Sequence, residues 1–127
     1  MKIIREGNAV KEEKKQKLID IGINVDEALE RFMGNDALLE KFLGKFAQDT
    51  NYQKLGEAVA AQDKELALTA SHTLKGVCGN LSMQKLYQLF AEQVRLFRAD
   101  DWEGAVAMMP QISEVFDRTV AVISEEA

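Results

Sequence analysis

One short stretch of the sequence, "SHTLKGVCGN" at residues 71–80, brings together side chains that can handle a phosphoryl group. His72 is the single histidine of the chain, and a neutral imidazole, with a reference pKa of about 6.5, offers a ring nitrogen as a nucleophile near pH 7. Lys75 follows at the i+3 position, one helical turn away, where its ammonium can neutralise phosphate oxygens. The pair predicts a site that accepts and releases a phosphoryl group.

Two glycines share this stretch, although each weakens a helix by about 1 kcal/mol relative to alanine. With Ala70 set at zero on a helical wheel, His72 falls at about 200°, opposite the predicted buried side. Gly76, Gly79 and Lys75 fall near it, and so does Leu68, one turn before His72. We expect the glycines to leave clearance for a partner's active site, and Leu68 to offer that partner an apolar contact. The predicted buried side comprises Leu66, Ala70, Leu74, Val77 and Leu81.

The alternative is that His72 is an ordinary surface residue, since histidine and lysine often occur at this spacing by chance. The glycines on the same face are what favour a functional interpretation.

The elements that must position this face are predicted to be helices throughout, because no segment alternates with a period of two. Asp26 is expected to cap a short helix ending at Gly34, and Asn35 to cap the next one. After a phase change at residues 48–51, either a kink or a new helix continues to about Ala61. The buried face of the helix after Asn35 is predicted to comprise Leu38, Leu39, Phe42, Leu43 and Phe46.

Three further helix features are predicted in the second half of the chain. Asp63, or the residue before it, caps the helix that carries His72, and Ser82 caps the helix that follows it. The last helix begins near Trp102 and ends near Ser124, with a kink or break at Pro110. Short turns make neighbouring helices antiparallel, so the fold class is all-α: an antiparallel up-down four-helix bundle with a short extra N-terminal helix. We expect a polar N-terminal arm or helix at 1–19 and the bundle at 20–127.

Composition excludes several classes of function. The net charge of −5 disfavours nucleic acid as the main partner. No apolar run reaches the length of about 18 residues that a membrane-spanning helix needs. The single cysteine, Cys78, excludes an internal disulfide and a multi-cysteine metal cluster, and is expected to be a small packed residue. Neither nucleotide-binding glycine motif is present. We therefore expect no cofactor, no metal site and no ATP-dependent kinase activity, in a cytoplasmic monomer.

The stretch "ASHTLKGVCGNLS" closely resembles the signature of histidine-containing phosphotransfer (HPt) domains: His, any residue, a hydrophobic residue, Lys, Gly, then small residues and a glycine. The upstream stretch "GINVDEALERFMGNDALLEKFLGKF" also looks like this family, so the resemblance covers about residue 20 to the C-terminus. It implies a four-helix bundle in which His72 accepts the phosphoryl group at Nε2 and carries it between receiver domains.

Two positions depart from the family pattern. Members often have a third glycine where this chain has Ser82. Members also often have a Gln or Glu on the next helix that hydrogen-bonds the imidazole, and the matching position here is Val94. The neighbouring Gln93 either takes over that bond through a small shift of the helix or is a partly buried polar residue.

The leading hypothesis is a phosphorelay carrier. His72 takes the phosphoryl group from a receiver-domain aspartate, or from a sensor kinase such as a hybrid kinase, and passes it to a response regulator. The receiver would supply Mg²⁺ and most of the charge neutralisation. The alternative is a helical docking module that binds a receiver or another partner without being phosphorylated. A third possibility is the phosphoaccepting domain of a chemotaxis-type kinase, which the absence of a following domain disfavours unless the chain is a fragment.

Overall fold

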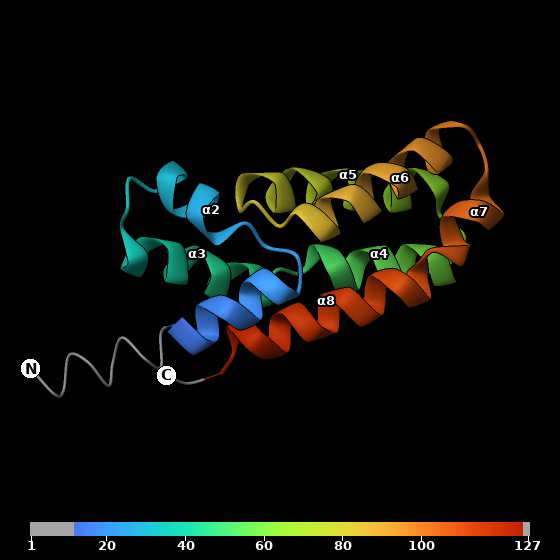
Figure 1. Ribbon diagram of the computed structural model, residues 1–127. Coiled ribbons are helices and arrows are strands. Elements are labelled where there is room, and N and C mark those ends of the chain that lie inside the picture. Colours follow the sequence, from blue (N-terminus) through green and yellow to red (C-terminus); the bar gives the residue numbers. More distant parts are fainter. Residues whose placement is uncertain (1–11, 126–127) are drawn as a thin grey trace, which may run out of the picture.

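The described residues of the computed structural model, 12–125, are almost entirely helical (Figure 1). They contain no strand, and a single isolated β-bridge joins Ile23 to Met83. The all-α prediction is therefore confirmed, while residues 1–11 of the predicted arm lie outside the described residues. A helix over residues 12–20 is followed by α2 (Val25–Arg31), α3 (Asp36–Ala47), α4 (Asn51–Ala60), α5 (Lys64–Asn80), α6 (Gln84–Arg98), α7 (Trp102–Ala107) and α8 (Met109–Ile123).

The main helices lie side by side along one long axis. In Figure 1, α3 and α4 follow each other in one line, and α4, α5, α6 and α8 run in alternating directions. Helix α5 packs against both α4 and α6, and α8 packs against α6 and α3. The core between them is apolar, and burying each large side chain stabilises the fold by about 1.5–3 kcal/mol. Its largest fully buried apolar members are Phe46, Phe90, Leu55, Leu74, Leu86, Met83 and Ile112.

Side-chain caps fix where several helices begin. The side chain of Asn35 accepts from the Leu38 N–H at 3.0 Å, and that of Asp63 accepts from the Leu66 N–H at 3.0 Å. Both caps were expected from the sequence and are confirmed. For α2 the cap is Asn24 and not Asp26, because the Asn24 side chain accepts the Glu27 N–H at 3.1 Å and Asp26 lies in the first turn.

Both expected interruptions are real helix breaks. Helix α3 ends at Ala47 and a separate helix, α4, begins at Asn51. The C-terminal helix is divided at Met108 into α7 and α8, with Pro110 in the first turn of α8. Proline is tolerated there because the first N–H groups of a helix have no partner within the helix.

The predicted buried faces of α3 and α5 are partly wrong. On α3 only Leu39, Leu43 and Phe46 are buried, whereas Leu38 and Phe42 are more than a third exposed. Phe42 stacks instead on Phe32 beyond the end of α2, with ring centroids 5.2 Å apart. The buried arc of α5 is turned by about 50° from the expected one. It consists of Ala67, Ala70, Ser71, Leu74 and Cys78, and leaves Leu66 44% exposed.

A backbone junction holds the start of α2 against the turn between α5 and α6. The Lys85 N–H donates to the Gly22 carbonyl at 3.1 Å, and the Asn24 N–H donates to the Ser82 carbonyl at 2.9 Å. Gly22 has a φ of +96°, and a Cβ there would lie 2.4 Å from Cβ of Lys85. Glycine is therefore required at position 22 for this close approach, which places α2 beside the end of α5.

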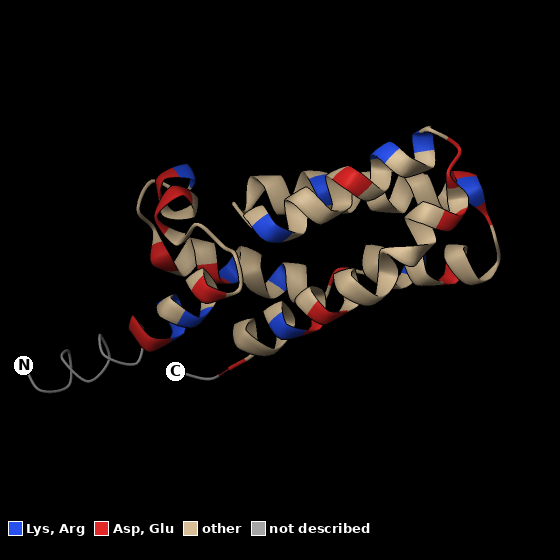
Figure 2. Cartoon of the chain, turned by 45° about the vertical axis from the view of Figure 1, so that its right-hand side comes forward, with Lys and Arg blue, Asp and Glu red and all other residues tan. Residues whose placement is uncertain are grey.

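The helix over residues 12–20 packs against the C-terminal end of α8. Lys14 Nζ donates to the carbonyls of Ile123 and Glu125, both at 3.0 Å, where it meets the negative end of α8. Lys17 pairs with the Glu125 carboxylate at 2.8 Å. Figure 2 shows both signs of charge on this helix and on α2.

Candidate functional site

His72 lies on the outer face of α5 and is exposed, as the wheel predicted. No hydrogen bond or ion pair to its imidazole occurs among residues 12–125. Two threonines flank it on the helix, and both hydroxyls bond back to α5 carbonyls: Thr69 to Glu65 at 3.0 Å and Thr73 to Thr69 at 2.9 Å. Both ring nitrogens of His72 thus remain open to an incoming group.

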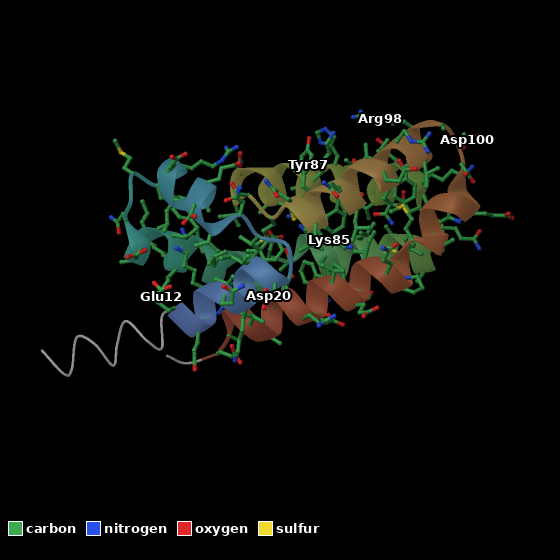
Figure 3. The ribbon with its side chains drawn as sticks, in the orientation of Figure 1. Glu12, Asp20, Lys85, Tyr87, Arg98 and Asp100 are labelled. Atoms are coloured by element: carbon green, nitrogen blue, oxygen red, sulfur yellow. The ribbon has the colours of Figure 1, made fainter. Side chains whose placement is uncertain are left out.

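A groove of about 710 Å³ runs beside the imidazole. Helix α5 contributes His72, Lys75 and both glycines, α6 contributes Tyr87, and α2 contributes Glu27 and Arg31. Figure 3 shows Tyr87 on the side of α6 where α5 lies. The sequence interpretation did not include Tyr87, Glu27 or Arg31, because their place at the groove depends on how α2 and α6 pack against α5.

Lys75 makes an aromatic contact at the groove. Its Nζ lies 5.9 Å from the centroid of the Tyr87 ring, within the range of a cation–π interaction. The side chain is half-buried, and no ion pair to its ammonium occurs within the described part of the chain. The ammonium is therefore available to phosphate oxygens at the groove.

The two glycines of the motif have different surroundings. A Cβ on Gly76 would meet nothing within 4 Å, so this position opens directly to the outside. A Cβ on Gly79 would lie 3.2 Å from two atoms of the Tyr87 ring. Gly79 lines the groove as well, but part of the space beside it is occupied by an aromatic ring of the same chain.

The family of the chain follows from comparison with known proteins. The sequence profile of the Hpt domain matches residues 37–122, which includes the whole of α5 and α6. The chain belongs to the Hpt domain family. Hpt domains are helical bundles with a phosphotransfer role in two-component signalling, and this role applies to the chain. Searches among curated proteins and among solved structures return no match.

Gln93, for which the sequence allowed either a hydrogen bond to the imidazole or a partly buried polar role, makes its hydrogen bonds inside the bundle. Gln93 is fully buried; its Oε1 accepts from Ser71 Oγ at 2.8 Å, and its Nε2 donates to the Ala105 carbonyl at 3.1 Å. Val94, at the matching family position, is buried as well. Gln93 therefore joins α5, α6 and α7 inside the bundle. In the described residues it makes no hydrogen bond to His72.

Ser82 has a backbone conformation that favours glycine. Its φ is +54°, in the left-handed region that glycine adopts at least cost. The expectation that Ser82 caps α6 is wrong, because Met83 occupies the cap position and the Ser82 hydroxyl donates to Glu27 Oε1 at 2.8 Å. A serine at this position therefore has a less favourable backbone conformation than glycine would, but its hydroxyl makes a hydrogen bond to α2.

Leu68 lies outside the groove beside His72, and Cys78 lies beneath it as a buried thiol. Leu68 is half-buried and lines a separate hollow of about 250 Å³ together with Phe97 and Trp102. The structure does not bring it into the groove beside His72. Cys78 is fully buried, as expected of a packed residue, and burial raises the pKa of its thiol to about 12. The thiol is therefore protonated at neutral pH and is not a nucleophile.

The described residues include no group of three or more His, Cys, Asp or Glu side chains placed to hold a metal ion. Over the same residues, no helix has the length and apolar character needed to cross a membrane.

Proposed function

We propose that His72 is the phosphoacceptor of a phosphorelay carrier, which takes a phosphoryl group from a receiver-domain aspartate or a sensor kinase and passes it to a response regulator. The observation that carries the proposal is the free imidazole of the single histidine, exposed beside Lys75 and the open backbone at Gly76. The Hpt family match supports it.

In the accepting step, a ring nitrogen of His72 attacks the phosphorus of the acyl phosphate in line. The N–P bond forms while the P–O bond to the aspartate breaks, and the electron pair of that bond returns to the carboxylate. Lys75 neutralises the phosphoryl oxygens in both the bound and the transferring state. Passing the group to a second receiver reverses these bond changes.

The partner supplies what this chain does not offer. Phosphoryl transfer depends mainly on positioning and charge neutralisation, and in this proposal the receiver brings Mg²⁺ for that purpose. The chain itself contributes the nucleophile, one cation and the access at Gly76. It has no kinase activity of its own and acts as a cytoplasmic monomer, with receiver domains and hybrid sensor kinases as its partners.

The proposal is tested by incubating the protein with a panel of phosphorylated receiver domains that carry a radiolabelled phosphoryl group. Acid-labile label is expected on the wild-type chain and not on His72→Gln. Label retained on His72→Gln contradicts the proposal. Binding of receivers with no label on either protein supports instead the docking module that is the alternative interpretation of the sequence.

A further inference from the structure

The groove beside His72 contains a second cation, Arg31, in the last turn of α2. Its Nη2 lies 3.5 Å from Glu27 Oε1, and its side chain is 49% exposed. The same Glu27 oxygen accepts the Ser82 hydroxyl at 2.8 Å, and Ser82 is buried in the turn between α5 and α6. Through Glu27, the guanidinium is therefore held near that turn.

Helix geometry separates Arg31 from the reacting nitrogen. His72 precedes Asn80, the last residue of α5, by eight residues, which corresponds to about 12 Å along the helix axis. Lys75 lies one turn from His72, whereas Glu27 and Arg31 are linked to Ser82, beyond the end of the helix. A phosphoryl group on His72 therefore lies nearer to Lys75, and Arg31 faces whatever part of a partner covers the far end of the groove.

The charge of the groove favours an acidic partner there. Its charged residues besides the titratable His72 are Glu27 and Arg31 on α2 and Lys75 on α5, and α6 contributes only uncharged side chains. These three charges sum to +1, so the groove is locally positive although the chain carries a net charge of −5. An exposed pair such as Arg31–Glu27 contributes little to stability, so a carboxylate of a partner exchanges with Glu27 at small cost.

We propose that Arg31 is a partner-recognition residue, which binds a carboxylate on the surface of the receiver domain that exchanges the phosphoryl group with His72. The inference rests on the proposed function and assigns separate roles to the two cations of the groove. Lys75 serves the phosphoryl group, and Arg31 serves docking. The planar guanidinium suits this task because it binds a carboxylate through two parallel hydrogen bonds.

The test compares Arg31→Ala with a matched control, Arg118→Ala. Arg118 also pairs with a glutamate at i,i+4, Glu114, but on α8 and outside the groove. Receiver domains are screened for the fastest acceptor from phosphorylated His72, and the transfer rate is measured against acceptor concentration and salt. Arg31→Ala is expected to raise the half-saturating concentration about fivefold and to weaken its salt dependence, with the maximal rate unchanged. Arg118→Ala should change neither.

Two further variants sharpen the result. Arg31→Lys should restore part of the salt dependence, and Glu27→Gln, which releases Arg31, should lower the half-saturating concentration. If Arg31→Ala and wild type have the same half-saturating concentration and salt dependence, the inference is overturned.

Labelling with phosphoramidate, a small phosphodonor that needs no docking, separates this failure from that of the proposed function. Equal labelling of His72 in wild type and Arg31→Ala is expected. No label on the wild-type protein from phosphoramidate or any phosphorylated receiver overturns the proposed function and, with it, the role of Arg31.

Discussion

The ring of Tyr87 covers the backbone of Gly79, so that a Cβ at position 79 would lie 3.2 Å from both Cδ1 and Cε1 of the ring. The same ring carries Lys75 Nζ on its face, 5.9 Å from the centroid. Gly79 thus admits an aromatic side chain, and the face of its ring meets the Lys75 ammonium. Gly76, which has no neighbour within 4 Å of a Cβ, is the more open of the two glycines, and we expect it to leave room for a partner.

Alanine substitutions at Gly76 and Gly79 should change the stability of the protein by different amounts. Gly76→Ala should raise the free energy of unfolding by about 0.5–1 kcal/mol, since alanine is the better helix former and its Cβ meets open space. Gly79→Ala should raise the free energy of unfolding by a smaller amount, because its Cβ would press on the Tyr87 ring. Urea unfolding measures both, and in a Tyr87→Ala background the two gains should become equal. A gain at Gly79 that matches Gly76 with Tyr87 in place contradicts the packing argument.

A large side chain at the open glycine should block the partner without unfolding the domain. Gly76→Leu is expected to slow phosphoryl transfer from a receiver about tenfold or more, because a small misplacement of the reacting groups is costly. The matched control is Gly56→Leu, an exposed helical glycine on α4 that also has nothing within 4 Å of a Cβ. Rapid-quench transfer assays should find the control unchanged. Equal rates for both variants would remove Gly76 from the docking surface.

Substitutions of Ser82 should rank by backbone conformation. Ser82→Ala loses the hydrogen bond to Glu27 and keeps the left-handed φ, so it should lower the free energy of unfolding by about 1–2 kcal/mol. Ser82→Gly loses the same bond but relieves a backbone cost of about 1 kcal/mol, and should be the more stable of the two. Thermal and urea unfolding test this order. The reverse order would show that the φ of +54° carries no cost in this turn.

Gln93 should prove structural. Gln93→Leu leaves the buried Ser71 hydroxyl without its acceptor and the Ala105 carbonyl without its side-chain donor, which is expected to cost about 1–3 kcal/mol of stability. Labelling of His72 by phosphoramidate should be unchanged at a temperature where the variant is folded. The Gln93→Leu, Ser71→Ala double variant should lose less than the sum of the single losses. Slower labelling in a folded Gln93→Leu protein would assign the amide a role at the imidazole.

Local features of the fold could be predicted from the sequence, and contacts between distant segments could not. The caps at Asn35 and Asp63 and the break near Pro110 depend on a few neighbouring residues, whose preferences decide the outcome. The exposure of Leu66 and Phe42 depends instead on where other helices lie, so the periodicity of one helix was not sufficient.

The candidate site divides in the same way. The outward position of His72 and its spacing to Lys75 follow from the helical period alone. The hydrogen bond from Ser82 to Glu27 joins residues 55 positions apart, and the amide of Gln93 meets Ser71 across 22 positions. Both contacts depend on helix packing. Because of them Ser82 does not cap α6 as expected, and Gln93 follows the buried-residue alternative and not the hydrogen bond to the imidazole.

The most direct test of the account locates the phosphoryl group on the protein. The chain is incubated with a phosphorylated receiver domain, digested at neutral to basic pH, and sequenced by mass spectrometry with a fragmentation method that preserves the N–P bond. One phosphorylated residue, His72, is expected, and this modification should be lost when unphosphorylated receiver is added in excess. A phosphoryl group on any other residue, or one that remains on His72→Gln, would contradict it.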